Sequence, residues 1–443
     1  MVKNTVLHRL QESGREEHMA QSEAAANLPP SALANHDLFY TLRAGEQAYD
    51  IPRMIRLEHT VLQIVPRLDS GGAERTSLEI AAALARAGGR AIVVSAGGRL
   101  ARDIENAGGE VIIAPVHSKN PAVMAANSFK LANLITEKKV DLVHARSRAP
   151  AWSALIAARR AGIPFVTTYH GAYSAAGAFK RLYNSSMLRA DRVIANSQFT
   201  ADRILAEAAE TAGRLRVIPR GVDIDLFDPQ KVSADRVGRI QEVWGVGEKS
   251  GLKLLLPARL TEWKGHPTAI DAISMLKDRF AADRATGQTP PLTLVFCGGV
   301  QGKQDYERRL RAMTDERGVR SMVHIVGECA DMPAAYAWAD AVLAPSTRPE
   351  AFGRVVVEAG AMGKPVIASD HGGARETVID GETGFLVQPG DGRDLCDAII
   401  RIQNQTHEAR MMMGEIARAR AASVYSSAAM CDATLNVYRE LLA

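Results

Sequence analysis

Two carboxylates, Glu350 and Glu358, stand eight positions apart across the expected start of a helix. Residues 352–362 are apolar around most of a helical circumference, and Pro349 disfavours helix before them, which predicts a loop, a buried helix and then a strand. A helix N-terminus presents unpaired N–H groups and a positive dipole end, so a diphosphate can lie between acids that accept hydrogen bonds from hydroxyl groups. An isolated pair of this kind is more often a helix cap and a solvated ion pair.

Two cations, Arg259 and Lys264, follow another expected strand, residues 252–256, and Gly265 comes next. A forked guanidinium and an ammonium at a strand end suit two phosphate groups whose negative charge grows as a bond to phosphate breaks. The alternative is a pair of solvated loop cations.

The first half of the chain has its own candidates at strand ends. Gly71 and Gly72 follow the first expected strand and open a helix, where glycines let the backbone approach a ligand, although a tight turn is the favoured explanation when they are taken alone. His170 closes the fifth strand, and a lone histidine is more often structural than catalytic. His144 ends the fourth strand and is expected to be structural or to face an acceptor. The sequence contains no G-x-G-x-x-G dinucleotide fingerprint.

Short apolar runs alternate with helical stretches from Thr60 onward, and this spacing predicts parallel sheets covered by helices on both faces. The pattern occurs twice, which predicts two Rossmann-like doubly wound domains, residues 56–232 and 250–408, facing a central cleft. A polar joint is expected between the two domains, around residues 232–250, and a polar, alanine-rich mobile extension over residues 1–55. The expected strands are 61–65, 91–94, 111–113, 141–144, 165–168, 192–195 and 215–218 in the first domain, and 252–256, 292–296, 323–326, 341–344, 366–368 and 384–387 in the second.

Composition indicates a globular cytoplasmic protein. Of the 443 residues 47% are hydrophobic, and 54 Lys and Arg against 50 Asp and Glu do not by themselves suggest a nucleic-acid partner. The four cysteines show no C-x-x-C spacing, which fits a reducing compartment. No apolar run approaches the ~20 residues that span a bilayer, and the first residues lack the apolar core of a secretory signal.

Several of these stretches together resemble retaining GT-B glycosyltransferases of family 4. The block from Pro345 to Ala368 is similar to the E-x7-E block of that family, with both acids, the glycines and the following strand in register. The segments 69–75, 169–171 and 257–265 also match, the last with one residue fewer between its two cations. The resemblance covers about residues 60–400.

The resemblance implies transfer of a hexose, with retention at the anomeric carbon, from a nucleoside diphosphate sugar to a glycan or glycolipid acceptor. Polysaccharide or lipopolysaccharide synthesis is the expected setting, and no cofactor or metal ion is expected. The first domain would bind the acceptor, the second the donor, and a helix over residues 409–443 would return to the first domain. The implied catalytic residues are Glu350 at the sugar, His170 beside it, and Arg259 and Lys264 at the diphosphate. The implied donor-binding set adds Gly71, Gly72, Val326, Ala351, Phe352, Gly353 and, at the ribose, Glu358.

Three other functions are compatible with parts of this pattern. A nucleotide-sugar epimerase would share the whole fold. A nicotinamide oxidoreductase would need the missing glycine fingerprint, and a solute-binding protein would need an export signal.

One long stretch is strongly basic. Residues 146–220 carry twelve Lys and Arg against four acids. This excess suggests either contact with an anionic membrane surface or a phosphorylated glycolipid acceptor, and a scattered basic face is the alternative.

Overall fold

The computed structural model describes residues 56–69, 71–171, 177–247, 251–282, 292–300, 302 and 304–443. The extension expected over residues 1–55 lies outside the described residues.

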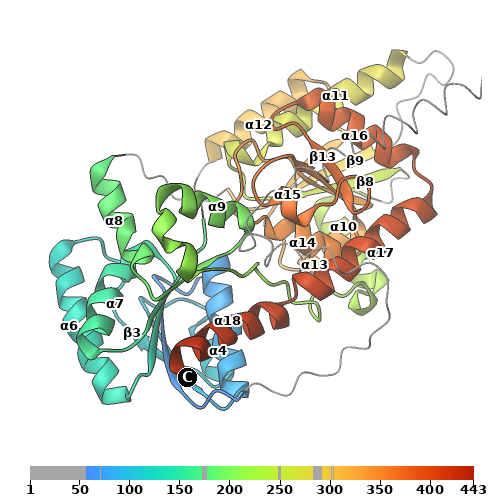
Figure 1. Cartoon of the computed structure of the whole chain (residues 1–443). Helices are drawn as coiled ribbons and strands as arrows, with labels where there is room; N and C mark the ends of the chain where they lie inside the picture. The colour runs from blue at the N-terminus through green and yellow to red at the C-terminus, as the bar shows by residue number, and fades with distance from the viewer. Residues whose placement is uncertain are drawn as a thin grey trace, which may run out of the picture. The chain divides into compact units, whose positions relative to one another are not determined.

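The first domain is built on a seven-stranded parallel sheet with the order β3-β2-β1-β4-β5-β6-β7 (Figure 1). Its central strands β1, β2, β4, β5 and β6 are largely buried, as the near-continuous apolar runs predicted, whereas the edge strands β3 and β7 are partly exposed. The strands are β1 (Thr60–Ile64), β2 (Arg90–Ser95), β3 (Glu110–Ile113), β4 (Leu142–Ala145), β5 (Phe165–Tyr169), β6 (Arg192–Ala195) and β7 (Leu215–Val217).

Helices connect these strands, and their ends follow from local sequence. Asn120 accepts a hydrogen bond from Ala122 N at the start of α6, and Ser197 accepts one from Thr200 N at the start of α9. Gly162 ends α7 in the left-handed conformation. The helices are α4 (Gly72–Arg86), α5 (Ala101–Asn106), α6 (Pro121–Lys138), α7 (Arg148–Ala161), α8 (Ala178–Leu188), α9 (Gln198–Glu207) and η1 (Ala209–Arg214).

The second domain repeats the plan with a six-stranded parallel sheet of order β10-β9-β8-β11-β12-β13. The two sheets bear out the predicted fold class. The strands are β8 (Leu252–Pro257), β9 (Leu292–Cys297), β10 (Val323–Gly327), β11 (Ala341–Ala344), β12 (Val366–Ser369) and β13 (Gly384–Val387). The connecting helices are η3 (Glu262–Lys264), α11 (His266–Ala282), α12 (Gln304–Glu316), α13 (Met332–Trp338), α14 (Arg354–Ala361), α15 (Ala374–Thr377) and α16 (Gly392–Asn404).

The stretch between the predicted domains holds more structure than the expected polar joint. After η2 (Pro229–Lys231), the helix α10 (Ala234–Trp244) packs against α13. The Trp244 ring meets the Trp338 ring edge-on, with centroids 5.4 Å apart. Helix α10 is amphipathic, and its apolar face belongs to the core of the second domain.

The C-terminal region consists of two helices where residues 409–443 predicted one: α17 (His407–Val424) and α18 (Ser427–Leu442). The helix is interrupted at Tyr425, whose carbonyl oxygen accepts a hydrogen bond from Val222 N at 2.7 Å, and Ser426 then caps the start of α18. Helix α17 packs on α14, whereas α18 lies beside α4 of the first domain (Figure 1). Only α18 therefore returns to the first domain.

No helix within the described part of the chain has the length and apolar character needed to span a bilayer.

Candidate functional site

The candidate residues gather where the strand order of each sheet reverses. In the first sheet β1 lies between β2 and β4, and in the second β8 lies between β9 and β11. At such a switch point the connections leave the sheet in opposite directions, and their strands' carboxyl ends border a ligand-binding crevice. Gly71 follows β1, while Arg259 follows β8 and Glu350 follows β11.

Lys264 and Glu350 form an ion pair at the second switch point. The Lys264 ammonium lies 2.8 Å from Glu350 Oε1, and the Ser346 hydroxyl donates to the same oxygen at 2.5 Å. Lys264 also sits over the Trp263 ring, 4.4 Å from its centroid. The Lys264 side chain is 12% exposed and that of Glu350 is 24% exposed. An incoming phosphate can therefore reach the Lys264 ammonium and bind it while the ammonium still contacts the Glu350 carboxylate.

A glycine makes this closeness of the two loops possible. Gly265 has a φ of +79°, and a Cβ there would lie 1.9 Å from Pro345 O. Thr347 N donates to Trp263 O at 2.7 Å and ties the same loops together. Any larger residue would push the loop carrying Lys264 away from the loop carrying Glu350.

Glu358 lies on α14, which starts at Arg354, so Glu350 belongs to the preceding loop and not to the helix. The Tyr336 hydroxyl donates to Glu358 Oε2 at 2.9 Å, and the Arg354 guanidinium lies 3.3 Å from Oε1. Burial raises the pKa of Glu358, while Arg354 and the Tyr336 hydrogen bond act in the opposite direction. Tyr336 was missed in the sequence because nothing local distinguishes it from other buried aromatics.

The side chain of Phe352 is part of the core. It is 3% exposed and meets the Tyr425 ring edge-on at 5.6 Å. A contact between this position and a donor, as the resemblance implied, would therefore have to use the backbone. Ala351 and Gly353 flank it in the same half-buried loop. Gly373 N donates to Glu350 O at 2.9 Å, which fixes the loop from the far side.

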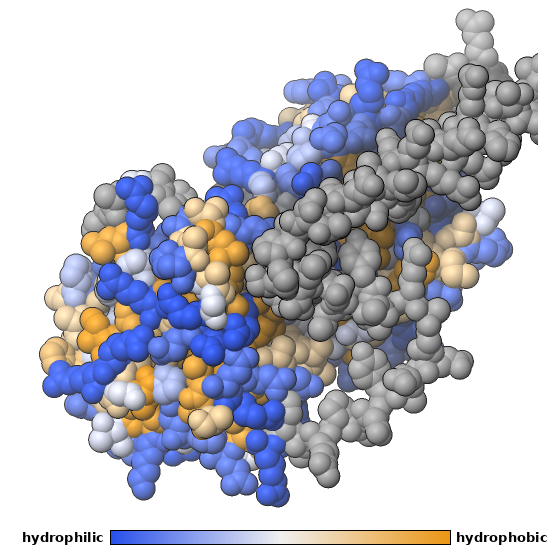
Figure 2. Space-filling model, viewed as in Figure 1, coloured by the Kyte–Doolittle hydropathy of each residue, from blue (hydrophilic) through white to orange (hydrophobic). Residues whose placement is uncertain are grey.

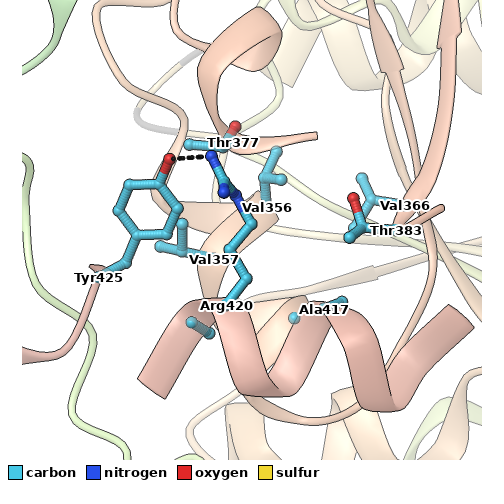
Figure 3. Close-up of a pocket in the computed structure, with 10 residues that line it drawn as sticks. Val356, Val357, Val366, Thr377, Thr383, Ala417, Arg420 and Tyr425 are labelled. Atoms are coloured by element: carbon cyan, nitrogen blue, oxygen red, sulfur yellow. Dashed lines mark hydrogen bonds between the residues drawn. The ribbon is translucent and has the colours of Figure 1, made fainter. Parts of the chain in front are cut away.

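Behind α14 the packing leaves only a cavity of about 10 Å³, too small for a sugar nucleotide. Figure 3 shows Arg420 extending from α17 to the Tyr425 hydroxyl, beside Val356 and Val357 of α14. Tyr425 in turn donates to Glu376 O at 2.7 Å. This region supports α14 and has no room for a substrate.

Arg259 and Val326 stand at the ends of different strands. Arg259 is exposed directly after β8, and Val326 is half-buried near the end of β10. Strand β9 separates the two, and Gly298 N donates to Gly327 O at 2.7 Å across that edge. Together with Lys264 and Glu350 they span the carboxyl edge of the second sheet.

At the first switch point, Gly71 caps α4 and Gly72 is its first residue. A Cβ at Gly72 would lie 1.9 Å from Arg220 Nη1 and 3.5 Å from Arg354 Cδ. Glycine therefore lets the Arg220 guanidinium approach a helix N-terminus, which is itself favourable for anions. The sequence analysis did not assign Arg220 to the site. The sequence did contain a signal for it, because Arg220 is a cation that follows β7 at the same edge of the sheet.

His170 is fixed by Arg220, whose Nη2 lies 2.8 Å from His170 Nδ1. A guanidinium only donates, so Nδ1 accepts and the ring proton is on Nε2. Nε2 is buried and has no hydrogen-bond partner among the described residues. Burial, followed by Arg220 and Arg146, holds the pKa of His170 well below its ordinary value of 6.5. His170 is thus a neutral N–H donor.

His144 belongs to a buried network that explains its place. Its Nδ1 lies 2.6 Å from the Tyr438 hydroxyl of α18, and its Nε2 lies 2.7 Å from Thr168 Oγ1. Burial is the main cause that holds the pKa of His144 well below 6.5. Of the two roles left open for His144, these contacts favour the structural one.

Arg146 corrects one expectation about the basic stretch. It was counted as part of a basic face, yet it is 2% exposed and donates through Nε to Gln63 Oε1 at 2.8 Å. It directly follows β4, where the chain enters the interior at the switch point.

Among the described residues, no group of three or more His, Cys, Asp or Glu side chains is arranged to hold a metal ion.

Two family models match the chain. The model for Glycosyltransferase Family 4 matches residues 70–226, and the model for Glycosyl transferases group 1 matches residues 243–420. The first match begins after β1 and covers the other strands of the first sheet, and the second match covers all strands of the second sheet.

Individual relatives point the same way. A glycosyltransferase from Rickettsia africae is 32% identical, with a TM-score of 0.79 over 87% of this chain and 99% of that chain. HepE of Anabaena, solved with UDP and glucose, is 26% identical, with a TM-score of 0.72 over 87% of this chain and 100% of that chain. A D-inositol 3-phosphate glycosyltransferase of Corynebacterium jeikeium is 30% identical over 57% of this chain and 58% of its own length. The chain thus spans little more than half the length of that curated relative.

Proposed function

We propose a sugar-transfer reaction for this chain, which belongs to glycosyltransferase family 4 and has the GT-B fold. The reaction moves a hexose from a nucleoside diphosphate sugar to a glycan or glycolipid acceptor, with retention at the anomeric carbon. The observation that carries the proposal is the Lys264–Glu350 pair, held at the switch point of the second sheet by Ser346 and the Gly265 turn. It combines a cation for a leaving phosphate with an acceptor for sugar hydroxyls.

Each donor group has a matching side chain in this proposal. Lys264 and Arg259 bind the diphosphate, whose charge increases as the glycosidic bond breaks. Glu350 accepts hydrogen bonds from the sugar and Glu358 from the ribose. Both acids are only partly exposed, which strengthens their hydrogen bonds relative to those in water.

The acceptor's proton does not go to His170 in this mechanism. The ring already carries its proton on Nε2, the nitrogen without a partner, so it donates a hydrogen bond to an oxygen of the sugar or acceptor. The departing phosphate oxygen takes the proton of the attacking hydroxyl on the same face of the sugar. Because Arg259 and Lys264 supply the positive charge, the proposed reaction needs no divalent metal.

The donor is proposed to be a UDP-sugar, because HepE was solved with UDP and glucose. The acceptor is proposed to carry a phosphate, in line with the name of the Corynebacterium relative, and to belong to polysaccharide or lipopolysaccharide synthesis at the cytoplasmic side of a membrane.

Thermal melting with UDP-, GDP- and ADP-sugars tests the donor assignment. A ligand at 100 times its dissociation constant stabilises the folded state by ~2.7 kcal/mol, so the correct nucleotide should stand out. No stabilisation by any of the three would contradict the proposal. Incubating the binding donor without acceptor and finding an epimerised sugar would favour the epimerase instead, and loss of transfer in EDTA with recovery in magnesium would refute metal independence.

A further inference from the structure

A large groove lies in the first domain, bordered by α6, α7 and α8, with a volume of about 1100 Å³. Pro66, just after β1, and Ser147, just after β4, form part of its wall. The groove therefore opens at the same switch point as the N-terminus of α4. None of the donor-binding residues named above lines it.

Among the described residues, the charged groups that line this groove are all basic. Lys119, Arg148 and Lys180 contribute cations and His117 adds an imidazole, and no described Asp or Glu belongs to the lining. Lys119 precedes α6, Arg148 begins α7 and Lys180 lies in the first turn of α8, so three separate elements bring them together. Such a lining favours a phosphate over a neutral sugar.

Some cations of the basic stretch outside the groove are paired. Arg159 pairs with Asp191, and both Arg192 and Arg216 pair with Glu440. Asp191 is already one of the four acids counted over residues 146–220, so of these two partners only Glu440 lowers the excess of positive charge. The stretch therefore stays basic, and its residues Arg148 and Lys180 line the groove.

The groove also has an apolar part. Ile156 and Leu182 line it and remain 49% and 56% exposed. Trp152 also lines it and packs against the core, with Nε1 donating to Tyr183 O at 3.0 Å. Figure 2 shows hydrophobic residues interspersed with hydrophilic ones over the domain that carries α6 to α8. A soluble sugar phosphate would leave these side chains in water, whereas a hydrocarbon chain would cover them. The volume also exceeds the roughly 300–1,000 Å³ of common small-molecule sites.

We infer that this groove binds the acceptor as an anionic amphiphile, a phosphate-bearing lipid that carries the hydroxyl to be glycosylated. The cations Lys119, Arg148 and Lys180 hold the phosphate, and Ile156, Leu182 and Trp152 hold the first part of the hydrocarbon chain. The inference rests on the proposed function and narrows its acceptor to this chemical class.

Binding without turnover separates the two chemical contributions. Calorimetry with octyl phosphate below its micelle concentration should give at least tenfold tighter binding than glucose 1-phosphate, which lacks the chain, or octyl glucoside, which lacks the phosphate. Equal binding of glucose 1-phosphate would overturn the lipid assignment, and equal binding of octyl glucoside would overturn the phosphate assignment.

Matched substitutions locate the site. The double variant Lys119→Ala with Lys180→Ala should weaken octyl phosphate binding by roughly tenfold or more, and Ile156→Ser with Leu182→Ser by a similar factor. Lys130→Ala and Phe129→Ser are the controls, because both residues are exposed on α6 outside the groove. Equal losses in the controls and groove variants would place binding elsewhere.

Stabilisation by the UDP-sugar should be unchanged in every groove variant. Intact donor binding with no octyl phosphate binding would refute the groove alone. Loss of all donor binding in the wild-type chain would instead refute the proposed function.

Discussion

The two domains share one architecture but carry opposite chemistry at their carboxyl edges. The second domain presents the acids Glu350 and Glu358, each held by a cation, Lys264 and Arg354. The first presents His170, a neutral donor fixed by a guanidinium, and a groove whose charged side chains, among the described residues, are all basic. The switch point is common to both sheets, and the side chains placed on it decide what each edge can bind.

The difference follows from what each group can donate or accept. Carboxylates accept hydrogen bonds and therefore suit hydroxyl-rich ligands, whereas guanidinium, ammonium and imidazole N–H groups donate and suit phosphate oxygens. Glu350 and Lys264 combine both capacities at one point, which suits them to the proposed bond-breaking step. The described lining of the groove in the first domain has no such acid, which fits the proposed role of holding and orienting an acceptor.

The largest expected effect is that of Lys264→Ala. Removing the cation beside the leaving phosphate should lower kcat about a hundredfold, since one lost contact of this type costs on the order of 3 kcal/mol. Steady-state kinetics with the best donor measures it. Lys277→Ala, in the C-terminal half of α11, is the control and should leave kcat unchanged. A rise in donor KM alone would show that Lys264 binds the donor equally in ground and transition states.

The two acids of the second domain should separate kinetically. Glu350→Gln should lower kcat, by roughly tenfold, more than it raises KM, because the sugar carries the developing charge. Glu358→Gln should mainly raise donor KM, because ribose contacts persist in both states. Glu316→Gln, at an exposed position at the end of α12, is the control. Identical kinetic changes in both acid variants would contradict the separate roles.

His170 tests the donor character of the first domain. His170→Phe should lower kcat by up to about tenfold, and His170→Gln, which keeps an N–H donor, should retain more activity. The depressed pKa of His170 keeps the ring neutral, so the wild-type rate should show no inflection from it between about pH 6 and 8. Equal losses in the two variants would show that hydrogen bonding at this position is not what matters.

Tyr438→Phe should affect stability more than catalysis. The change leaves buried His144 without its partner on α18 and should lower the free energy of unfolding by about 1–3 kcal/mol. Urea denaturation measures it. Tyr306→Phe is the matched control in the second domain, because the buried Tyr306 hydroxyl has no hydrogen-bond partner among the described residues. Similar destabilisation by both changes would indicate lost packing and not the hydrogen bond.

The smallest effect concerns pH. Burial raises the pKa of Glu358 above 4.5, so ionising it disfavours the folded state. Below the pKa that Glu358 has in the unfolded chain, its carboxyl group is protonated in both the folded and the unfolded state, and the penalty is absent. Above its pKa in the folded state, the full cost of ionisation lowers the free energy of unfolding. The melting temperature of Glu358→Gln relative to wild type should therefore rise as pH increases from about 4 to 8. If the melting temperature of Glu358→Gln relative to wild type falls over that range, the attraction of Arg354 for the Glu358 carboxylate outweighs the effect of burial.

Much of the fold follows from local sequence. Each of the thirteen predicted strands is a strand in the structure, with ends displaced by at most one residue. Apolar runs of this length bounded by glycine and polar residues have few other ways to be buried, so the pattern alone was sufficient. The polar stretch after Val232 was misjudged, because the amphipathic face of α10 becomes meaningful only once its partner α13 is known.

Part of the candidate site also follows from the sequence, and part of it depends on the tertiary structure. The sequence by itself determined which residue types stand at strand ends, because Glu350, Lys264 and His170 lie next to the apolar runs that place them there. Only the tertiary structure decided that Lys264 pairs with Glu350 across 86 positions and that His144 meets Tyr438 across 294. It also decided that the polar side chain of Arg146 is buried while Ile156 remains half exposed in a groove. Sheet order and helix packing bring such distant segments together, and burial then sets their charge and hydrogen bonding, which no local pattern of residues encodes.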